Sequence, residues 1–189
     1  MAINYIALML VNMAAGLLLL GLFVLVGLRE PNRTPWSPAF AMVGAVAVAT
    51  GLHMTLAWPF PGQAAWVNCA YGELTVLLGA MFLGAALATA KGWHLLPVAI
   101  YGLSAGVIAL VVGLRIGDLG LTKEPTVAAV GFMLTGLGGV LMVLAVLMPR
   151  SVAVRLLVAL DLFAAAALWC FTGVMAYWGH IARFAGKGG

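Results

Sequence analysis

Residues 4–28 read NYIALMLVNMAAGLLLLGLFVLVGL, a run that contains no acidic or basic side chain. A bilayer with a hydrocarbon core about 30 Å thick needs about 20 consecutive apolar residues to be crossed by an α-helix. The segment is long enough to do so. Because the bilayer core offers no water to backbone N–H and C=O groups, and the alternating pattern of barrel strands is absent, the segment is expected to be helical.

Five further segments share this character, and none contains more than one acidic, basic or histidine residue. The predicted spans after the first are residues 39–58, 67–90, 95–114, 126–148 and 156–178. Hydrophobic residues make up 65% of the chain and charged residues only 7%, whereas about 25% of a typical soluble domain is charged. The sequence therefore predicts an all-α polytopic membrane protein. We expect a six-transmembrane-helix bundle with short loops that forms a single transmembrane domain over residues 1–189.

Tryptophans and basic residues mark the ends of these spans. The tryptophans near span ends are Trp36, Trp58, Trp66, Trp93 and Trp178, as expected for the aromatic belts of a membrane protein. The connections after the first, third and fifth spans carry Arg29, Arg33, Lys91, Arg150 and Arg155. The opposite side carries Arg115, Lys123, Arg183 and Lys187. This bias predicts that both termini lie on the non-cytoplasmic side of a prokaryotic inner membrane. Because the basic residues form no single face, no nucleic-acid partner is expected.

Glu73 is the polar residue that most needs an explanation, because a carboxyl group inside a span costs several kcal/mol unless it is paired, protonated or hydrated. His53 lies near the end of the second span, and the short turn after it makes the second and third spans a hairpin. His53 and Glu73 should therefore lie at a similar depth. Together with Asn68 they predict a polar site for a proton or a small solute near one membrane face.

Two cofactor interpretations compete with that site. Imidazole, thiolate and carboxylate groups suit copper or zinc, so His53, Cys69, Glu73 and His180 are candidate metal ligands, although no pair has the spacing of a known metal motif. His53 and His180 are also candidate axial ligands of haem b in a helical bundle. A structural hydrogen bond between His53 and a neutral Glu73 is the simplest alternative. The sequence leaves these readings open.

Other polar and small residues favour structural roles. Asp161 lies early in the sixth span, where we expect a structural charge pair with Arg155. Cys69 and Cys170 fall inside spans and are interpreted as small buried side chains. Gly102-x-x-x-Gly106 is a motif that lets neighbouring transmembrane helices approach closely.

The second and third spans carry a resemblance to a known family. Residues 51–62, GLHMTLAWPFPG, and residues 68–73, NCAYGE, resemble the signature region of a multi-pass bacterial and archaeal membrane family catalogued as domain of unknown function 981. The resemblance implies a small helical membrane protein, with the Trp-Pro-x-Pro-Gly turn and the Gly-Glu pair as its most recognisable positions. The family pattern has a Tyr-Asn pair after the turn, where this chain has Val67-Asn68. The resemblance supports attention to Glu73 without supplying its role.

No motif of catalysis or phosphate binding occurs in the chain, and its connections are too short to form an extramembrane binding domain. We therefore expect a non-catalytic accessory subunit or small-solute binding protein whose polar site is formed by the hairpin of the second and third spans. Its expected partners are the lipid bilayer and either further copies of itself or a larger membrane complex. The alternatives are a proton-coupled carrier that uses Glu73 and a redox subunit that binds haem b, copper or zinc.

Overall fold

The computed structural model describes residues 5–186, which form six long helices and no strand. The long helices are α1 (Ile6–Leu25), α2 (Ser37–Ala57), α3 (Leu74–Lys91), α4 (Leu96–Leu119), α5 (Pro125–Leu147) and α6 (Val152–Phe184). Short helical turns η1 (Gly27–Arg29), η2 (Thr34–Trp36) and η3 (Gly62–Ala64) lie in the connections, and the π-helix η4 (Asn68–Glu73) leads into α3. All six long helices are long and apolar enough to span a membrane, which confirms the predicted fold class.

The helix bounds follow the predicted spans closely, with one large difference in α6. Asn4, the predicted start of the first span, lies outside the described residues. Helix α6 contains 33 residues and is therefore about 50 Å long at 1.5 Å per residue. It starts before the predicted span because the Ser151 hydroxyl accepts a hydrogen bond from the Val154 amide at 3.4 Å. It continues past Trp178 because no proline interrupts it before Phe184.

Two glycines terminate helices where the backbone takes a left-handed conformation. Gly92 ends α3 with φ 67°, and Gly120 ends α4 with φ 61°. Glycine tolerates this conformation because it has no Cβ. Trp58 ends α2 with φ 48°, and the following Pro59 lacks the amide that a further helical hydrogen bond would need.

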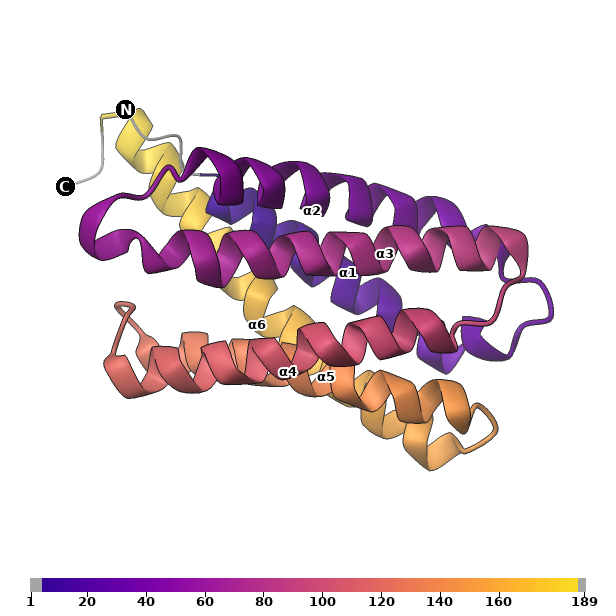
Figure 1. The fold of residues 1–189 in the computed structure, drawn as a ribbon. Helices are drawn as coiled ribbons and strands as arrows, with labels where there is room; N and C mark the ends of the chain where they lie inside the picture. The colour runs from indigo at the N-terminus through magenta and orange to yellow at the C-terminus, as the bar shows by residue number, and fades with distance from the viewer. Residues whose placement is uncertain (1–4, 187–189) are drawn as a thin grey trace.

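The six helices form a closed ring, in which each helix contacts its neighbours along the chain and α6 contacts α1. The most extensive contacts join α4 with α5, α1 with α6, and α2 with α3, and weaker contacts between α5 and α6, α1 and α2, and α3 and α4 complete the circle. One end of the ring carries the connections α1–α2, α3–α4 and α5–α6, and we call it the basic end after the residues described below. The other end carries both termini and the connections α2–α3 and α4–α5 (Figure 1), and we call it the terminal end.

Small residues bring α4 and α5 into backbone contact. A Cβ atom added at Gly106 would lie 2.6 Å from the Gly136 carbonyl oxygen, and one added at Gly139 would lie 2.7 Å from the Gly102 carbonyl oxygen. The packing role predicted for the Gly102 and Gly106 motif is therefore confirmed. Helices α1 and α2 are joined by a hydrogen bond from Asn12 Nδ2 to the Val43 carbonyl oxygen at 3.0 Å.

Large apolar side chains cover the outer surface of the ring. Leu56 is 79% exposed and Leu160 is 69% exposed, as expected for side chains that face lipid. Cys69 and Cys170 are also exposed, so their interpretation as buried side chains was wrong. Sequence periodicity could not reveal this, because both faces of such helices are apolar and only packing decides which face is buried.

Candidate functional site

Asn68 lies at the start of the π-helix η4 and is completely buried. Its Nδ2 donates to the Phe60 carbonyl oxygen at 2.7 Å and to the Ala65 carbonyl oxygen at 3.2 Å, and its Oδ1 accepts from the Phe60 amide at 3.3 Å. Two of these hydrogen bonds tie Phe60, in the middle of the Trp-Pro-x-Pro-Gly turn, to the following helix. The predicted role of Asn68 in a proton or solute site stays a prediction.

We expect Asn68→Ala to lower the free energy of unfolding by about 2 kcal/mol, because the variant leaves the amide and carbonyl of Phe60 without their partner. Unfolding in mixed micelles with increasing denaturant measures the change. Asn32→Ala is the matched control, since Asn32 makes one exposed hydrogen bond to the Thr34 amide and should cost about 0.5 kcal/mol. Equal losses in the two variants would contradict the structural role of Asn68.

His53 lies on α2 and is exposed. Its Nδ1 lies 2.8 Å from the Tyr5 hydroxyl, and the two rings meet edge to face with centroids 5.1 Å apart. This hydrogen bond links α2 to the chain just before α1. The imidazole is therefore paired with Tyr5, from a part of the chain that the hairpin interpretation did not include.

Glu73 ends the π-helix η4 and is exposed on the outer surface of the ring. The Cys69 thiol, one turn earlier, interacts with its carboxyl group through a side-chain hydrogen bond. No hydrogen bond joins Glu73 to His53 among residues 5–186, and the roles assigned to these two residues stay predictions.

The candidate metal and haem ligands lie toward the terminal end. Within the described chain, no group of three or more histidine, cysteine, aspartate and glutamate side chains is arranged to hold a metal ion. His180 lies one turn before α6 ends at Phe184. Neither His53 nor His180 lines the two cavities described below.

Asp161 and Arg155 lie on α6 and are the two buried charged residues of the described chain, 8% and 9% exposed. They make no ion pair with each other in this part of the chain, where the one salt bridge joins Arg115 and Asp118. Arg155 Nη1 instead donates to the Leu25 carbonyl oxygen at 2.6 Å and ties α6 to α1. Both carboxylate oxygens of Asp161 are buried without a hydrogen-bond partner.

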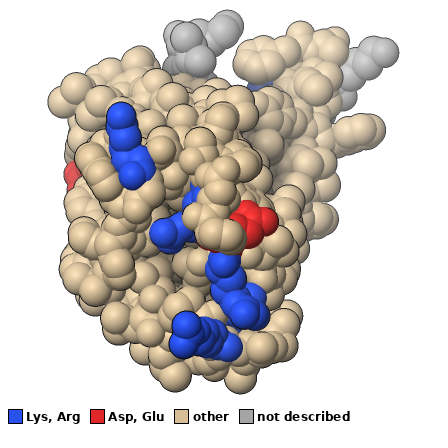
Figure 2. All heavy atoms as spheres, turned by 90° about the vertical axis from the view of Figure 1, so that its right-hand side faces the viewer, with Lys and Arg blue, Asp and Glu red and all other residues tan. Residues whose placement is uncertain are grey.

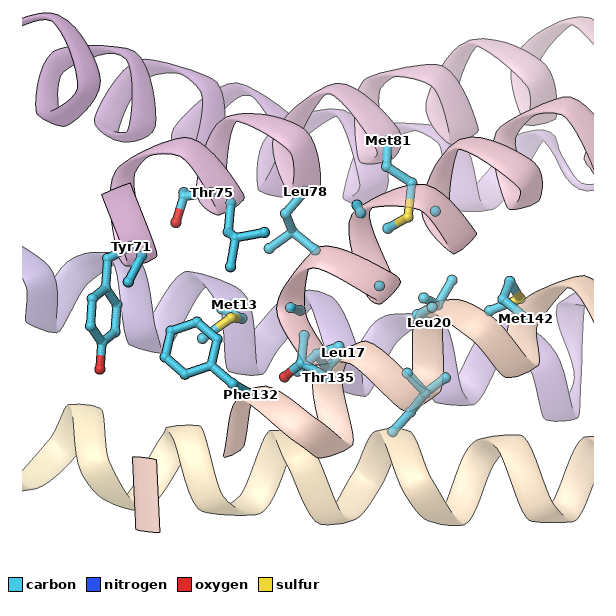
Figure 3. Close-up of a pocket in the computed structure, with 18 residues that line it drawn as sticks. Met13, Leu17, Leu20, Tyr71, Thr75, Leu78, Met81, Phe132, Thr135 and Met142 are labelled. Carbon is cyan, nitrogen blue, oxygen red and sulfur yellow. The ribbon is translucent and has the colours of Figure 1, made fainter. Parts of the chain in front are cut away.

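A central cavity of about 70 Å³ lies inside the ring and is the main feature that sequence reasoning missed. Figure 3 shows Tyr71 and Phe132 at one end of it and Leu20, Met81 and Met142 toward the other. The walls come from α1, η4, α3, α4, α5 and α6. None of the lining side chains is charged.

Three hydroxyl groups are the polar side-chain groups among the residues that line this cavity. The Thr135 hydroxyl is engaged, because it donates to the Gly131 carbonyl oxygen and accepts from Trp169 Nε1, each at 2.8 Å. The hydroxyls of Tyr71 and Thr75 have no protein partner within residues 5–186. The cavity therefore offers a long apolar wall with two free hydroxyls near one end.

No residue type in the sequence indicates such a cavity, since leucine, methionine, alanine and glycine line it and also fill the rest of the bundle. The π-helix is what turns Tyr71 inward, where its ring packs edge to face on Phe132 with centroids 5.2 Å apart. π-Helical segments occur frequently at functional sites. The adjacent Gly72 allows this arrangement because a Cβ there would lie 3.0 Å from Met54 Cγ on α2.

The six long apolar helices define an integral membrane protein of the polytopic α-helical class. The family described as "Protein of unknown function (DUF981)" matches residues 1–183. The chain belongs to this family, as its Trp-Pro-x-Pro-Gly turn and Gly-Glu pair predicted. No curated protein and no solved structure matches the chain.

Proposed function

We propose that this protein binds a hydrocarbon chain inside the membrane, in the central cavity. The observation that carries the proposal is an interior space of about 70 Å³ with uncharged walls. An empty cavity of this volume costs about 2 kcal/mol at about 24 cal/mol per Å³, and an apolar occupant offsets that cost. The proposal keeps the predicted class of small-solute binding protein and moves the site from the hairpin to the interior.

The chemistry of the walls supports an apolar ligand over an ion or a proton. A charged solute would lose its hydration without gaining an opposite charge, which is strongly unfavourable in an apolar environment. Glu73 does not line the cavity, so a carrier that uses this carboxyl receives less support.

The packing of the ring suggests how a chain enters. Helices α3 and α4 contact each other far less than α4 contacts α5 or α2 contacts α3. Both α3 and α4 line the central cavity. We infer that a lipid chain enters from the bilayer between these two helices.

Filling the cavity tests the proposal. Ala105 on α4 lines it, so Ala105→Phe should reduce binding of a chain by about tenfold, which corresponds to a loss of about 1.4 kcal/mol. The measurement is photolabelling by a phosphatidylcholine that carries a diazirine in one acyl chain, with labelled residues identified by mass spectrometry. Labelling of Met81 and Met142 should fall, whereas labelling of the outward-facing Leu160 should remain.

Ala80→Phe is the matched control, because Ala80 is exposed on α3 and does not line the cavity. Its labelling pattern should equal that of the unmodified protein. Labelling confined to outward-facing residues in all three proteins would refute the proposal.

A further inference from the structure

The basic end of the ring has a strongly one-sided charge. Its exposed or half-buried basic residues are Arg29, Arg33, Lys91 and Arg150, and its acidic residue is Glu30. Figure 2 looks onto this end and shows Lys and Arg side chains spread across it with little acidic surface among them. At the terminal end the described basic residues Arg115, Lys123 and Arg183 are matched by Glu73, Asp118 and Glu124.

The basic residues of this end are not neutralised by the protein. None of them makes a salt bridge within residues 5–186, where the one ion pair lies at the terminal end. Glu30 uses its Oε2 to accept a hydrogen bond from Trp36 Nε1 at 2.9 Å. Four cationic groups are therefore left available for an external anion.

A second cavity extends from the central cavity toward this end. The two cavities share Leu20, Met81 and Met142 as lining residues. The second cavity is lined further by Leu95, which follows Lys91 in the α3–α4 connection, and by Val146, one turn before Arg150.

Trp36 connects the walls of the second cavity to the charged surface. Its ring packs on Phe23 at 5.4 Å and on Phe40 at 6.4 Å between centroids, and both phenylalanines line the second cavity. Arg33 lies three residues before Trp36. Each of the three connections at the basic end thus carries a basic residue within four residues of a side chain that lines the second cavity or packs on its walls. These basic residues are Arg33, Lys91 and Arg150.

The combined length of the two cavities suits a lipid chain. Along η4 and α3 their lining runs from Ala70 to Ala85, which is about 20 Å at 1.5 Å per residue. One leaflet of the hydrocarbon core is about 15 Å deep, half of about 30 Å. In length, the two cavities therefore match an acyl chain that starts at the basic end.

We propose that the ligand is an anionic phospholipid whose phosphate headgroup binds Arg33, Lys91 and Arg150 at the basic end while one acyl chain occupies the two cavities. The inference rests on the proposed function and adds the headgroup and the direction of the lipid. Juxtamembrane basic residues attract anionic lipids electrostatically. The predicted orientation puts this end at the cytoplasmic leaflet, which carries such lipids.

The test compares phosphatidylglycerol with phosphatidylcholine of identical acyl chains, added to delipidated protein and quantified by native mass spectrometry. Each basic residue near an anionic surface is worth about fivefold in affinity. The triple variant Arg33→Gln, Lys91→Gln, Arg150→Gln should therefore lose about 100-fold in affinity for phosphatidylglycerol. Its affinity for phosphatidylcholine should remain unchanged. Glycerol phosphate without acyl chains should not displace the bound lipid.

Two further variants control the experiment. The triple variant Arg115→Gln, Lys123→Gln, Arg183→Gln removes the same charge from the terminal end and should retain the preference for phosphatidylglycerol. The triple variant Arg33→Lys, Lys91→Arg, Arg150→Lys keeps the charge of the basic end, and it should retain the preference too.

The outcomes separate the two proposals. Equal affinities of the unmodified protein for the two lipids, or equal losses in the two glutamine variants, would overturn the headgroup inference. Displacement by glycerol phosphate would overturn the placement of an acyl chain in the two cavities. If Ala105→Phe removes binding of both lipids but the unmodified protein shows no preference for phosphatidylglycerol, only the headgroup inference fails. If Ala105→Phe leaves binding of both lipids unchanged, the proposed function fails as well.

Discussion

Gly136→Ala is expected to lower the free energy of unfolding by about 3 kcal/mol, the upper part of the range for overpacked interiors. A Cβ atom at this position would lie 2.6 Å from the Gly106 carbonyl oxygen and 2.9 Å from the Leu110 amide nitrogen. Both are backbone atoms of α4, so no side-chain rotation can relieve the clash. Helices α4 and α5 would have to separate along the most extensive contact of the ring.

Unfolding by denaturant in mixed micelles, followed by circular dichroism, measures this change. Gly84→Ala is the matched control, since its Cβ would meet the nearest atom, Val98 Cγ2, at an ordinary 3.6 Å. Alanine is the better helix former by about 1 kcal/mol, so this control should be neutral or more stable than the unmodified protein. Destabilisation of the two variants to the same extent would mean that α4 and α5 are not packed backbone to backbone.

Asp161→Ala is expected to raise the free energy of unfolding by about 2 kcal/mol, the opposite sign to most substitutions of buried residues. The carboxyl group is buried without a hydrogen-bond partner, and its Oδ2 lies 2.9 Å from where a Cβ of Gly138 would stand. Burying a polar group that forms no hydrogen bond is unfavourable. Removing the group eliminates this cost and leaves only a small void.

The same unfolding assay measures the gain. Asp161→Asn is the control, because an amide of similar size is equally unpartnered and should change the stability by less than about 1 kcal/mol. A loss of stability in Asp161→Ala would show that the carboxyl group binds something in the membrane. Asp161 would then be a candidate functional residue, because ionisable residues inside membrane proteins commonly have a function.

The number and positions of the spanning helices could be predicted because the free energy of inserting a segment into a bilayer is mainly a sum over its own residues. The six predicted spans correspond to α1 to α6, and only the length of α6 differs strongly. The neighbour of Glu73 on its own helix, Cys69, could also be predicted, because a helix brings residues four apart onto one face.

The orientation of each helix about its axis could not be predicted. In a soluble protein the polar face marks the outside, but lipid-facing and buried residues are equally apolar here. Glu73 faces outward and Asp161 is buried, and the apolar pattern around each residue indicates neither orientation. The charge pair predicted for Asp161 and Arg155 does not form. Arg155 instead donates a hydrogen bond to the Leu25 carbonyl oxygen on α1, a contact that only the packing of α6 against α1 creates.

The sequence by itself determined that this protein crosses a membrane as six helices, and it determined the family, because apolar length and local motifs need no distant contacts. The tertiary structure alone decided that the helices close into a ring around an apolar cavity. That cavity depends on unequal packing, with glycines drawing α4 against α5 while α3 and α4 touch weakly. A cavity between helices results from how the helices pack and not from the type of any single residue, so it can be found only in the folded structure.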